Sequence, residues 1–418
     1  MKFIHAADIH LDSPLSGLAA YKDAPTDLLR TVTRDAFTRL VDAAIEESVD
    51  FMVIAGDLYD GSWKDYNTGH FFCREMGRLN KAGIPVYLLF GNHDADSEMT
   101  KKLTLPLNVH QFETRKANTF LIAGLKVALH GRSYKEAATV ENLATSYPLP
   151  VAGWLNIGVL HTALEGYAAH ANYAPCSLAE LSAKGYDYWA LGHVHEHAIL
   201  QNDPWVVFPG NLQGRHIRET GARGAILVTA DESGVQSVER LLVDVLRWHV
   251  VEVDASEANT LEDVVRRVGR TFEQLIEQNP EKIYLSVRVC IKGRTAVHGE
   301  LFGLEAQLRE EILGQAAAQG HDRLWVEKVR IETQPLTDVA QLVARSDAIA
   351  DLQRFLDEAP EDAALLESLM ADLRPLVDRV PMDVIHSLPE LNAIRSGNVA
   401  GIIKSVTPGL LAYLAKSN

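Results

Sequence analysis

Five short groups of polar residues in the first half of the chain have the residue types that bind metal ions. In order, they are Asp8-Ile9-His10, Gly56-Asp57-Leu58-Tyr59-Asp60, Gly91-Asn92-His93-Asp94, His161 and Gly192-His193-Val194-His195. Carboxylate, imidazole and amide ligands without a thiolate suit Mn²⁺, Fe or Zn better than soft ions. Six or seven such ligands are too many for one four-coordinate zinc site, but they match two adjacent metal ions.

The spacing within these groups indicates how they would bind an ion. In Asp8-x-His10 and His193-x-His195 the two side chains are two positions apart. Strand alternation would turn both members of a pair to the same side, as a chelating pair. Glycines that precede three of the groups permit tight turns close to an ion. A pair of ions needs a bridging carboxylate, and Asp57 is the best candidate because its group is central.

Each group alone has a simpler explanation. A single histidine such as His161 is usually a surface residue or a satisfied core residue, and an Asp-x-His pair arises by chance in long chains. Gly-Asn-His-Asp and Gly-His-x-His are stronger signals, because a polar cluster after an apolar strand is costly to bury unless it is used. The occurrence of all five groups, each after an apolar segment, favours one shared metal site.

The apolar segments before the groups indicate buried strands, which would place the polar residues along one edge of a sheet. These segments are Lys2–Ala7, Phe51–Ala55, Ile84–Phe90, Leu155–Leu160 and Tyr186–Leu191. Apolar residues have helical spacing over Asp27–Glu47 and Tyr66–Ala82. Further strands are expected at Trp205–Phe208, Gly224–Thr229 and Val235–Leu242. The pattern predicts an α/β fold over residues 1–245, a β-sandwich flanked by helices, with ligands bound at the carboxyl ends of its strands.

The rest of the chain has a different pattern. Strands at Trp248–Val253, Ile283–Ile291 and Leu324–Ile331 alternate with helices at Leu261–Gln278 and Leu301–Gln315, which predicts a small α+β domain over residues 246–335. Residues 336–418 indicate a helical region, with breaks around Pro360, Pro381, Pro389 and Pro408. Its apolar stripe must be buried, either on its own chain or by a partner that docks there. That stripe contains Leu365, Leu366, Leu369, Leu373 and Leu376.

Composition limits the classes of protein. A chain of 418 residues suggests two or three domains, and 47% apolar residues allow a sizeable core. The net charge of −16 argues against a protein that coats nucleic acid by charge alone, although metal ions would allow nucleic acid as a substrate. Cys73, Cys176 and Cys290 are far apart, which argues against a disulfide framework and a thiolate metal site.

Nothing in the sequence predicts a membrane protein. Apolar runs stay well short of the roughly 20 residues that span a bilayer. The first residues are interrupted by Asp8, too early for the core of a signal peptide. The expected location is therefore the cytoplasm.

The order D-x-H, G-D-x-x-D, G-N-H-D, H and G-H-x-H resembles the calcineurin-like metallophosphoesterases. The opening Ala-Asp-Ile-His-Leu-Asp-Ser-Pro-Leu, with Gly-Asp-Leu-Tyr-Asp and Gly-Asn-His-Asp after it, is similar to the DNA-repair exonuclease branch that includes SbcD. The stretch Gly210-Asn211-Leu212-Gln213-Gly214-Arg215-His216 resembles the bacterial YhaO-type members of the family. The resemblance covers residues 1–245, and the next domain is similar in element order to the capping domain of these nucleases.

The resemblance implies a ligand set for each of two divalent metal ions, most often Mn²⁺, with Fe or Zn as alternatives. The first ion would take Asp8, His10, Asp57 and His195, and the second would take Asp57, Asn92, His161 and His193. His93 would be the general acid or a stabiliser of the transition state. Asp94 would orient His93, or cap a helix.

Substrate contacts follow less directly from the resemblance. Arg215, His216 and Arg218 form a small basic group that would contact phosphate, unless they only form a solvated loop. Relatives often have further basic or histidine residues after the second group, whereas this chain has Asp60-Gly61-Ser62-Trp63-Lys64. The DNA contacts of the family are therefore not transferred to that segment.

The expected function is a two-metal phosphodiesterase, a DNA exonuclease or endonuclease of DNA repair. By resemblance it would work with an SbcC-type ATPase and form a homodimer. One alternative is a small-molecule or protein phosphatase with the same metal site, which the acidic composition favours. A second is a non-catalytic scaffold, although a scaffold has no need for a complete ligand set.

Overall fold

The structure is a computed structural model of the chain. It describes residues 1–15, 26–60, 66–96, 104–164, 173–280, 283–320, 323–336, 348–378, 380, 385 and 389–416. The chain divides into two compact units, the first ending at Trp248 and the second beginning at His249. Among the described helices, none has the length and apolar character to cross a membrane.

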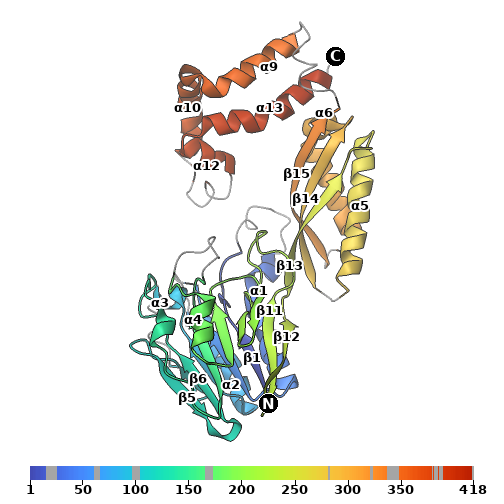
Figure 1. The fold of residues 1–418 in the computed structure, drawn as a ribbon. Coiled ribbons are helices and arrows are strands. Elements are labelled where there is room, and N and C mark those ends of the chain that lie inside the picture. The colour runs from blue at the N-terminus through green and yellow to red at the C-terminus, as the bar shows by residue number, and fades with distance from the viewer. Residues whose placement is uncertain are drawn as a thin grey trace. The chain divides into compact units, whose positions relative to one another are not determined.

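The first unit contains two six-stranded sheets (Figure 1). One has the order β12-β11-β1-β2-β3-β4, formed by Gly234–Leu242, Gly224–Asp231, Lys2–Ala6, Phe51–Ala55, Val86–Leu89 and Val109–Gln111. The other has the order β5-β6-β7-β8-β10-β9, formed by Asn118–Ile122, Val127–Gly131, Leu155–His161, Tyr188–Gly192, Trp205–Phe208 and Ala198–Asn202. In the first sheet β1, β2, β3 and β4 are parallel, and in the second β6, β7, β8 and β10 are parallel.

The apolar core of this unit lies between the two sheets. Phe3 and Phe51 stack at 4.9 Å between ring centroids within the first sheet, and Tyr188 of the second sheet meets Phe3 edge-on at 5.5 Å. All three rings are buried, and so are the small and β-branched residues around them. Burial of both strand faces explains why these strands are almost continuously apolar in sequence.

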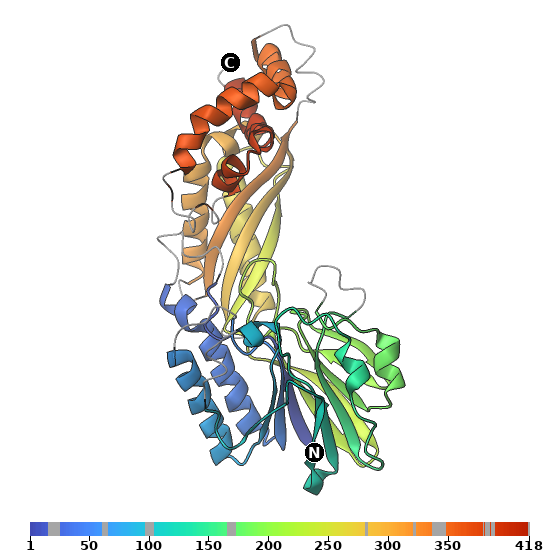
Figure 2. The ribbon, with the colours of Figure 1, turned by 90° about the vertical axis from the view of Figure 1, so that its left-hand side faces the viewer.

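Helices cover the outer faces of both sheets. Helix α1 (Thr26–Glu46) packs beside α2 (Tyr66–Lys81) against the first sheet, where Phe37 meets Phe71 and Phe72 (Figure 2). Helix α4 (Leu178–Ala183) lies by the second sheet, and its Leu181 carbonyl accepts the indole N–H of the buried Trp189 at 3.1 Å. The predicted α/β fold class, a sandwich flanked by helices, is confirmed.

The second unit has a three-stranded sheet of order β13-β14-β15, formed by Leu246–Asp254, Tyr284–Thr295 and Leu324–Pro335. Strands β14 and β15 are parallel. Helix α5 (Leu261–Gln278) begins at a capping box between Thr260 and Asp263, and packs with α7 (Glu305–Ala318) over an apolar core. The predicted order of elements is confirmed, except that α6 (His298–Gly303) and α7 replace a single helix.

Short helices follow: α9 (Ala348–Glu358), η4 (Ala359–Glu361), α10 (Ala363–Val377), α12 (Pro389–Arg395) and α13 (Val399–Lys416), the last of which packs against α6. The helix break expected at Pro360 is present, but the one expected at Pro408 is wrong, because α13 continues through it. Pro381 lies outside the described residues. The three-domain division at residues 245 and 335 stays a prediction.

The leucine stripe of α10 is only partly covered on its own chain, and its burial by a docked partner stays a prediction. Leu376 is 56% exposed, and Leu365, Leu366, Leu369 and Leu373 are only partly covered by the described residues. An amphipathic helix therefore forms here without being fully packed on its unit.

Candidate metal centre

The five polar groups lie where strands of the two sheets end. Asp8, Asp57 and Asn92 come after β1, β2 and β3, which are parallel neighbours in the first sheet. His161 is the last residue of β7, and His193 directly follows β8, its parallel neighbour in the second sheet. The carboxyl ends of parallel strands meet at one edge of a sheet, so the fold brings the predicted residues together.

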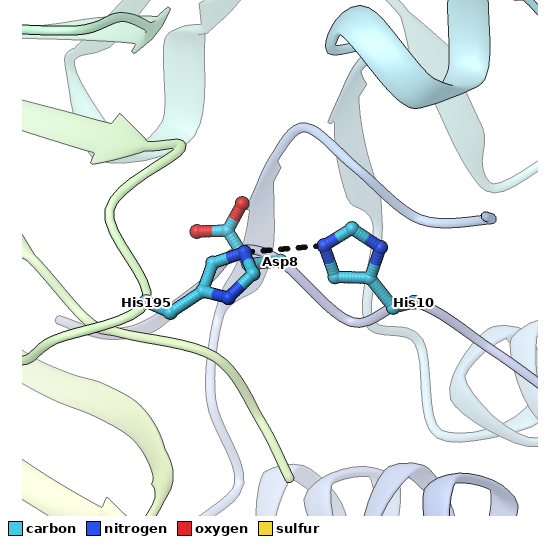
Figure 3. Close-up of side chains that lie close together, drawn as sticks. All are labelled: Asp8, His10 and His195. Atoms are coloured by element: carbon cyan, nitrogen blue, oxygen red, sulfur yellow. Dashed lines mark hydrogen bonds between the residues drawn. The ribbon is translucent and has the colours of Figure 1, made fainter. Parts of the chain in front are cut away.

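A first cluster contains Asp8, His10 and His195. One ligand atom from each lies within 4.8 Å of the others, and the Nε2 atoms of His10 and His195 are 3.3 Å apart. Figure 3 shows the two rings turned toward each other with the Asp8 carboxylate beside them. Asp8 and His10 are fully buried, whereas His195 is partly exposed.

A second cluster contains Asp57, His161 and His193, again with ligand atoms within 4.8 Å of one another. The Nε2 atom of His161 lies 3.4 Å from Asp57 Oδ2 and 3.0 Å from the amide oxygen of Asn92. All four residues are buried. The two clusters and the adjoining Asn92 thus account for the seven residues that the resemblance assigned to the two metal ions.

The carboxylate of Asp57 borders both clusters. Its Oδ1 atom accepts the backbone N–H of His93 at 3.0 Å. Its Oδ2 atom lies 3.4 Å from Nε2 of His161 and 3.9 Å from Nε2 of His10. This oxygen therefore lies between one histidine of each cluster.

The expected chelating pairs are only half right, because the residues concerned are not in strands. His193 has φ of 102° and belongs to the second cluster, whereas His195 belongs to the first. The expectation that strand alternation turns them to the same side is therefore wrong. Asp8 and His10 do share a cluster, but through left-handed backbone with φ of 50° and 45°. Non-glycine residues in this region cost free energy and are concentrated at functional sites.

Glycines are needed where the chain segments approach closely. A Cβ atom on Gly91 would clash with the carboxylate of Asp57 and would lie 2.9 Å from Cε1 of His161. A Cβ atom on Gly192 would clash with the carbonyl oxygen of Ala55. The glycines noted in the sequence thus allow the ligands of the second cluster to meet.

The donor atoms fit a pair of bound cations. The Nδ1–H of His161 donates to the carbonyl oxygen of Ala55 at 2.9 Å, which turns the Nε2 lone pair toward the oxygens of Asp57 and Asn92. Nδ1 of His10 is buried and faces Oδ1 of Asp60 at 3.7 Å, beyond hydrogen-bond distance. Acceptors that converge in a buried place need a proton or a metal ion between them.

The pKa values of these groups reflect the same crowding. Burial lowers the pKa of His161, but the charge of Asp57 and its hydrogen bond outweigh burial and raise it to about 9. Burial also raises the pKa of Asp8 and lowers that of His10 to about 4. Burial would raise the pKa of Asp57 too, but the charges of His161 and His10 hold it below its ordinary value. A proton on His161 thus occupies the electrostatic role that a cation would take.

His93 lies at the border of the centre, with 40% of its side chain exposed. Its Nδ1 atom is 3.0 Å from Asp60 Oδ1, and its ring centroid is 4.9 Å from that of His10. The hydrogen bond with Asp60 raises the pKa of His93 above its ordinary value. Asp60 belongs to the second polar group, but the sequence did not single it out as a partner of His93.

Asp94, expected to orient His93 or to cap a helix, instead holds backbone. Its carboxylate accepts N–H groups from Leu58 at 3.1 Å, Tyr59 at 2.9 Å and Gly91 at 3.0 Å. Asp94 is the third residue of α3 (Asn92–Asp96), so it is not the N-cap residue, but its bond from the N–H of Gly91 ties the residue before the helix to the first turn. It ties the second and third polar groups together, and the carboxylate beside His93 is that of Asp60.

The proposed phosphate contacts differ in their burial and in their partners. The Nη1 atom of Arg215 donates to Ser13 Oγ at 3.2 Å and lies 4.0 Å from Oδ2 of Asp60. His216 is partly buried, and Arg218 is exposed, with its backbone N–H donating to Nδ1 of His216. Arg215 is therefore the member of this group that borders His93 through Asp60. The segment 61–64 lies outside the described residues.

Glu219 was not identified from the sequence. Its side chain is buried, and Oε1 accepts Nδ1–H of His195 at 2.7 Å. Burial raises the pKa of Glu219, but the hydrogen bond and charge of His195 outweigh burial and hold it below its ordinary value. A single glutamate in a loop has no distinguishing sequence pattern, so only the folded structure identifies it.

Comparison with known proteins agrees with this arrangement. A family profile described as calcineurin-like phosphoesterase matches residues 1–197, and one described as the middle domain of metallophosphoesterase YhaO matches residues 248–334. The metallophosphoesterase YhaO of Bacillus subtilis (strain 168) is 33% identical over 82% of this chain and 84% of its own.

Two more distant relatives bear the name DNA double-strand break repair protein Mre11. The protein from Methanopyrus kandleri is 26% identical over 90% of this chain and 87% of its own. The protein from Sulfurisphaera tokodaii is 24% identical over 67% of this chain and 71% of its own.

Proposed function

This chain belongs to the calcineurin-like metallophosphoesterases of the YhaO type, which are related to the Mre11 DNA-repair nucleases, and we propose that it hydrolyses phosphodiester bonds of DNA. The observation that carries the proposal is the pair of His/Asp clusters that Asp57 borders, with His93 at their edge. Seven ligands suit two divalent ions. Mn²⁺ is the proposed metal, and Fe and Zn fit the same donors.

The chain's own residues have separate roles in the proposed reaction. Asp8, His10, Asp57 and His195 would hold one ion, and Asp57, Asn92, His161 and His193 the other. Two bound ions would lower the pKa of the attacking water and neutralise the charge of the phosphate.

His93 would protonate the leaving oxygen, because Asp60 keeps its pKa raised and its ring is partly exposed. Arg215, beside Asp60, would contact a non-bridging phosphate oxygen through its guanidinium group. His216 and Arg218 would contact phosphates farther along the substrate.

DNA as the substrate is supported by the relatives and not by charge. The chain carries a net charge of −16, so it lacks the overall positive field of proteins that bind nucleic acid electrostatically. The relatives named for DNA double-strand break repair match up to 90% of this chain. We extend the proposal to an exonuclease or endonuclease that works with an SbcC-type ATPase, as a homodimer.

The test is degradation of labelled single- and double-stranded DNA by the purified protein with Mn²⁺, alone and with an SbcC-type ATPase. The wild-type protein should cleave DNA, and His93→Ala should lose about 10²–10⁴-fold in turnover. His70→Ala is a matched control, because His70 is an exposed histidine of α2 outside the polar groups. It should cleave DNA like the wild-type protein.

The remaining functions predict different results. Hydrolysis of bis-p-nitrophenyl phosphate without DNA cleavage, with or without the ATPase, would point to a phosphatase that acts on small molecules or proteins. A protein without bound metal and without activity toward any phosphate ester would be a scaffold. Either result would refute the nuclease proposal.

A further inference from the structure

The environment of His195 is defined by one buried carboxylate, that of Glu219. The side chain of Glu219 is only 6% exposed. Its Oε1 atom accepts Nδ1–H of His195 at 2.7 Å, and its Oε2 atom accepts Nδ2–H of Asn211 at 3.0 Å and the backbone N–H of Arg215 at 2.6 Å. His195 makes the only one of these three hydrogen bonds that goes to Oε1, and Arg215 and His216 lie farther from that oxygen, at 3.8 and 3.7 Å.

This contact determines which nitrogen of His195 faces the first cluster. A neutral imidazole carries one N–H and one lone pair. Since Nδ1 donates to Glu219, the lone pair is on Nε2, the atom that lies 3.3 Å from Nε2 of His10. A carboxylate in this position also makes the imidazole a stronger ligand.

The backbone of His195 is fixed separately. The guanidinium of the buried Arg223 donates to the carbonyl oxygen of His195 and, at 3.1 Å, to Oδ1 of Asn211. Asn211 in turn donates to Glu219. Loss of the Glu219 carboxylate would therefore release the ring of His195 while Arg223 still holds its backbone.

In the second cluster the ring of His161 is oriented by a backbone carbonyl and not by a carboxylate. The corresponding support of His161 is the carbonyl oxygen of Ala55, which accepts Nδ1–H at 2.9 Å. A backbone carbonyl is unaffected by a substitution at Glu219. The two clusters should therefore respond differently when that carboxylate is removed.

We propose that Glu219 is a positioning residue that sets the metal affinity of the cluster formed by Asp8, His10 and His195, while leaving the cluster around His161 unaffected. The inference rests on the proposed dinuclear centre. Through its bond to the backbone of Arg215, the same carboxylate also links that cluster to the proposed phosphate contact.

The experiment is calorimetric titration of Mn²⁺ into metal-stripped full-length protein. The wild-type protein should bind two ions. Glu219→Gln should weaken one of the two by about 10–100-fold, the usual effect of losing such a support, and leave the other unchanged. Asp244→Asn is the matched control, because Asp244 is also buried in the first unit but forms an ion pair with Arg247 at 2.9 Å. It should bind both ions like the wild-type protein.

A double-mutant cycle tests whether Glu219 acts through His195. In a His195→Gln background the step to Glu219→Gln should cause no further loss of affinity. Urea denaturation checks that each variant is folded. If Glu219→Gln is unfolded, Glu219→Asp replaces it, because the shorter side chain keeps the charge but draws the carboxylate away from Nδ1.

The outcomes separate this inference from the proposed function. A wild-type protein that binds no divalent ion would overturn both. A folded but less stable Glu219→Gln variant that binds both ions with wild-type affinity would show that Glu219 only stabilises its loop. That result would overturn this inference alone. Equal weakening of both sites would also overturn it.

Discussion

Replacement of Gly91 by alanine should damage the second cluster most and the first cluster less, through Asp57. The added Cβ atom would clash with Oδ1 of Asp57 and would lie 2.9 Å from the backbone nitrogen of Asp57 and from Cε1 of His161. Real Cβ atoms hardly ever come within 3.0 Å of another atom. Neither neighbour can move easily, because Asp57 and His161 are buried and hydrogen-bonded.

The size of the effect follows from this overlap. Overpacking of a buried site costs about 1–3 kcal/mol. If the strain is relieved by displacing Asp57 and His161, it appears as about 5–150-fold weaker metal binding. Turnover should fall further, because a ligand displaced by about 1 Å can cost 10²-fold in rate. Asp57 borders both clusters, so neither ion should be fully spared.

The assay compares Gly91→Ala with Gly77→Ala. Gly77 lies in α2, and a Cβ atom there would have no neighbour within 4 Å. Gly77→Ala should therefore be stabilised by about 0.5–1 kcal/mol in urea denaturation, with unchanged Mn²⁺ affinity and unchanged hydrolysis of bis-p-nitrophenyl phosphate. Wild-type metal affinity and wild-type turnover in Gly91→Ala would refute the argument that close approach requires this glycine.

Three further predictions concern the charges of the centre. Asp57→Asn should weaken both ions, because Asp57 Oδ2 lies near both His10 and His161, and calorimetry that shows one unaffected site would contradict this. Asp60→Asn should remove the main cause of the raised pKa of His93, so the alkaline limb of the pH–kcat profile should move to lower pH; an unmoved limb would contradict it. Metal affinity should rise about tenfold per pH unit up to about pH 9, because an ion must displace the proton of His161, whose pKa is raised to about 9. Titrations at pH 7, 8 and 9 that give equal affinities would exclude this displacement.

The residues of the two clusters could be predicted because each is in a short group after an apolar strand. The order of those strands in the sheets follows from their parallel pairing, which places consecutive strand ends together. Strands β4, β5, β6 and β9 were not predicted. Strand β5 lies at a sheet edge, and none of its residues is fully buried, so its sequence lacks a clear apolar signal.

The supporting residues could not be predicted, because they are ordinary residues brought in from a distance. Asp60 reaches a histidine 33 positions later, and Glu219 reaches one 24 positions earlier. No local spacing marks either pair. The same reason explains why the backbone contacts of Asp94 were not predicted: it is adjacent to His93 in sequence but accepts N–H groups from residues 35 and 36 positions away.

The arrangement of ligands in two clusters also depends on backbone that no periodicity predicts. Asp8, His10 and Asp57 all have left-handed backbone, which costs about 1–2 kcal/mol for each L-residue. Backbone hydrogen bonds maintain it: the N–H of Asp8 donates to Gly56 and that of His10 to Asp57, both at 3.0 Å. These bonds extend the pairing of β1 and β2 beyond the strands and fasten the first two polar groups to each other. The hydrogen bonds of the chain itself therefore hold Asp8, His10 and Asp57 in left-handed backbone. The free energy that offsets its cost comes from the fold, and metal binding need not provide it.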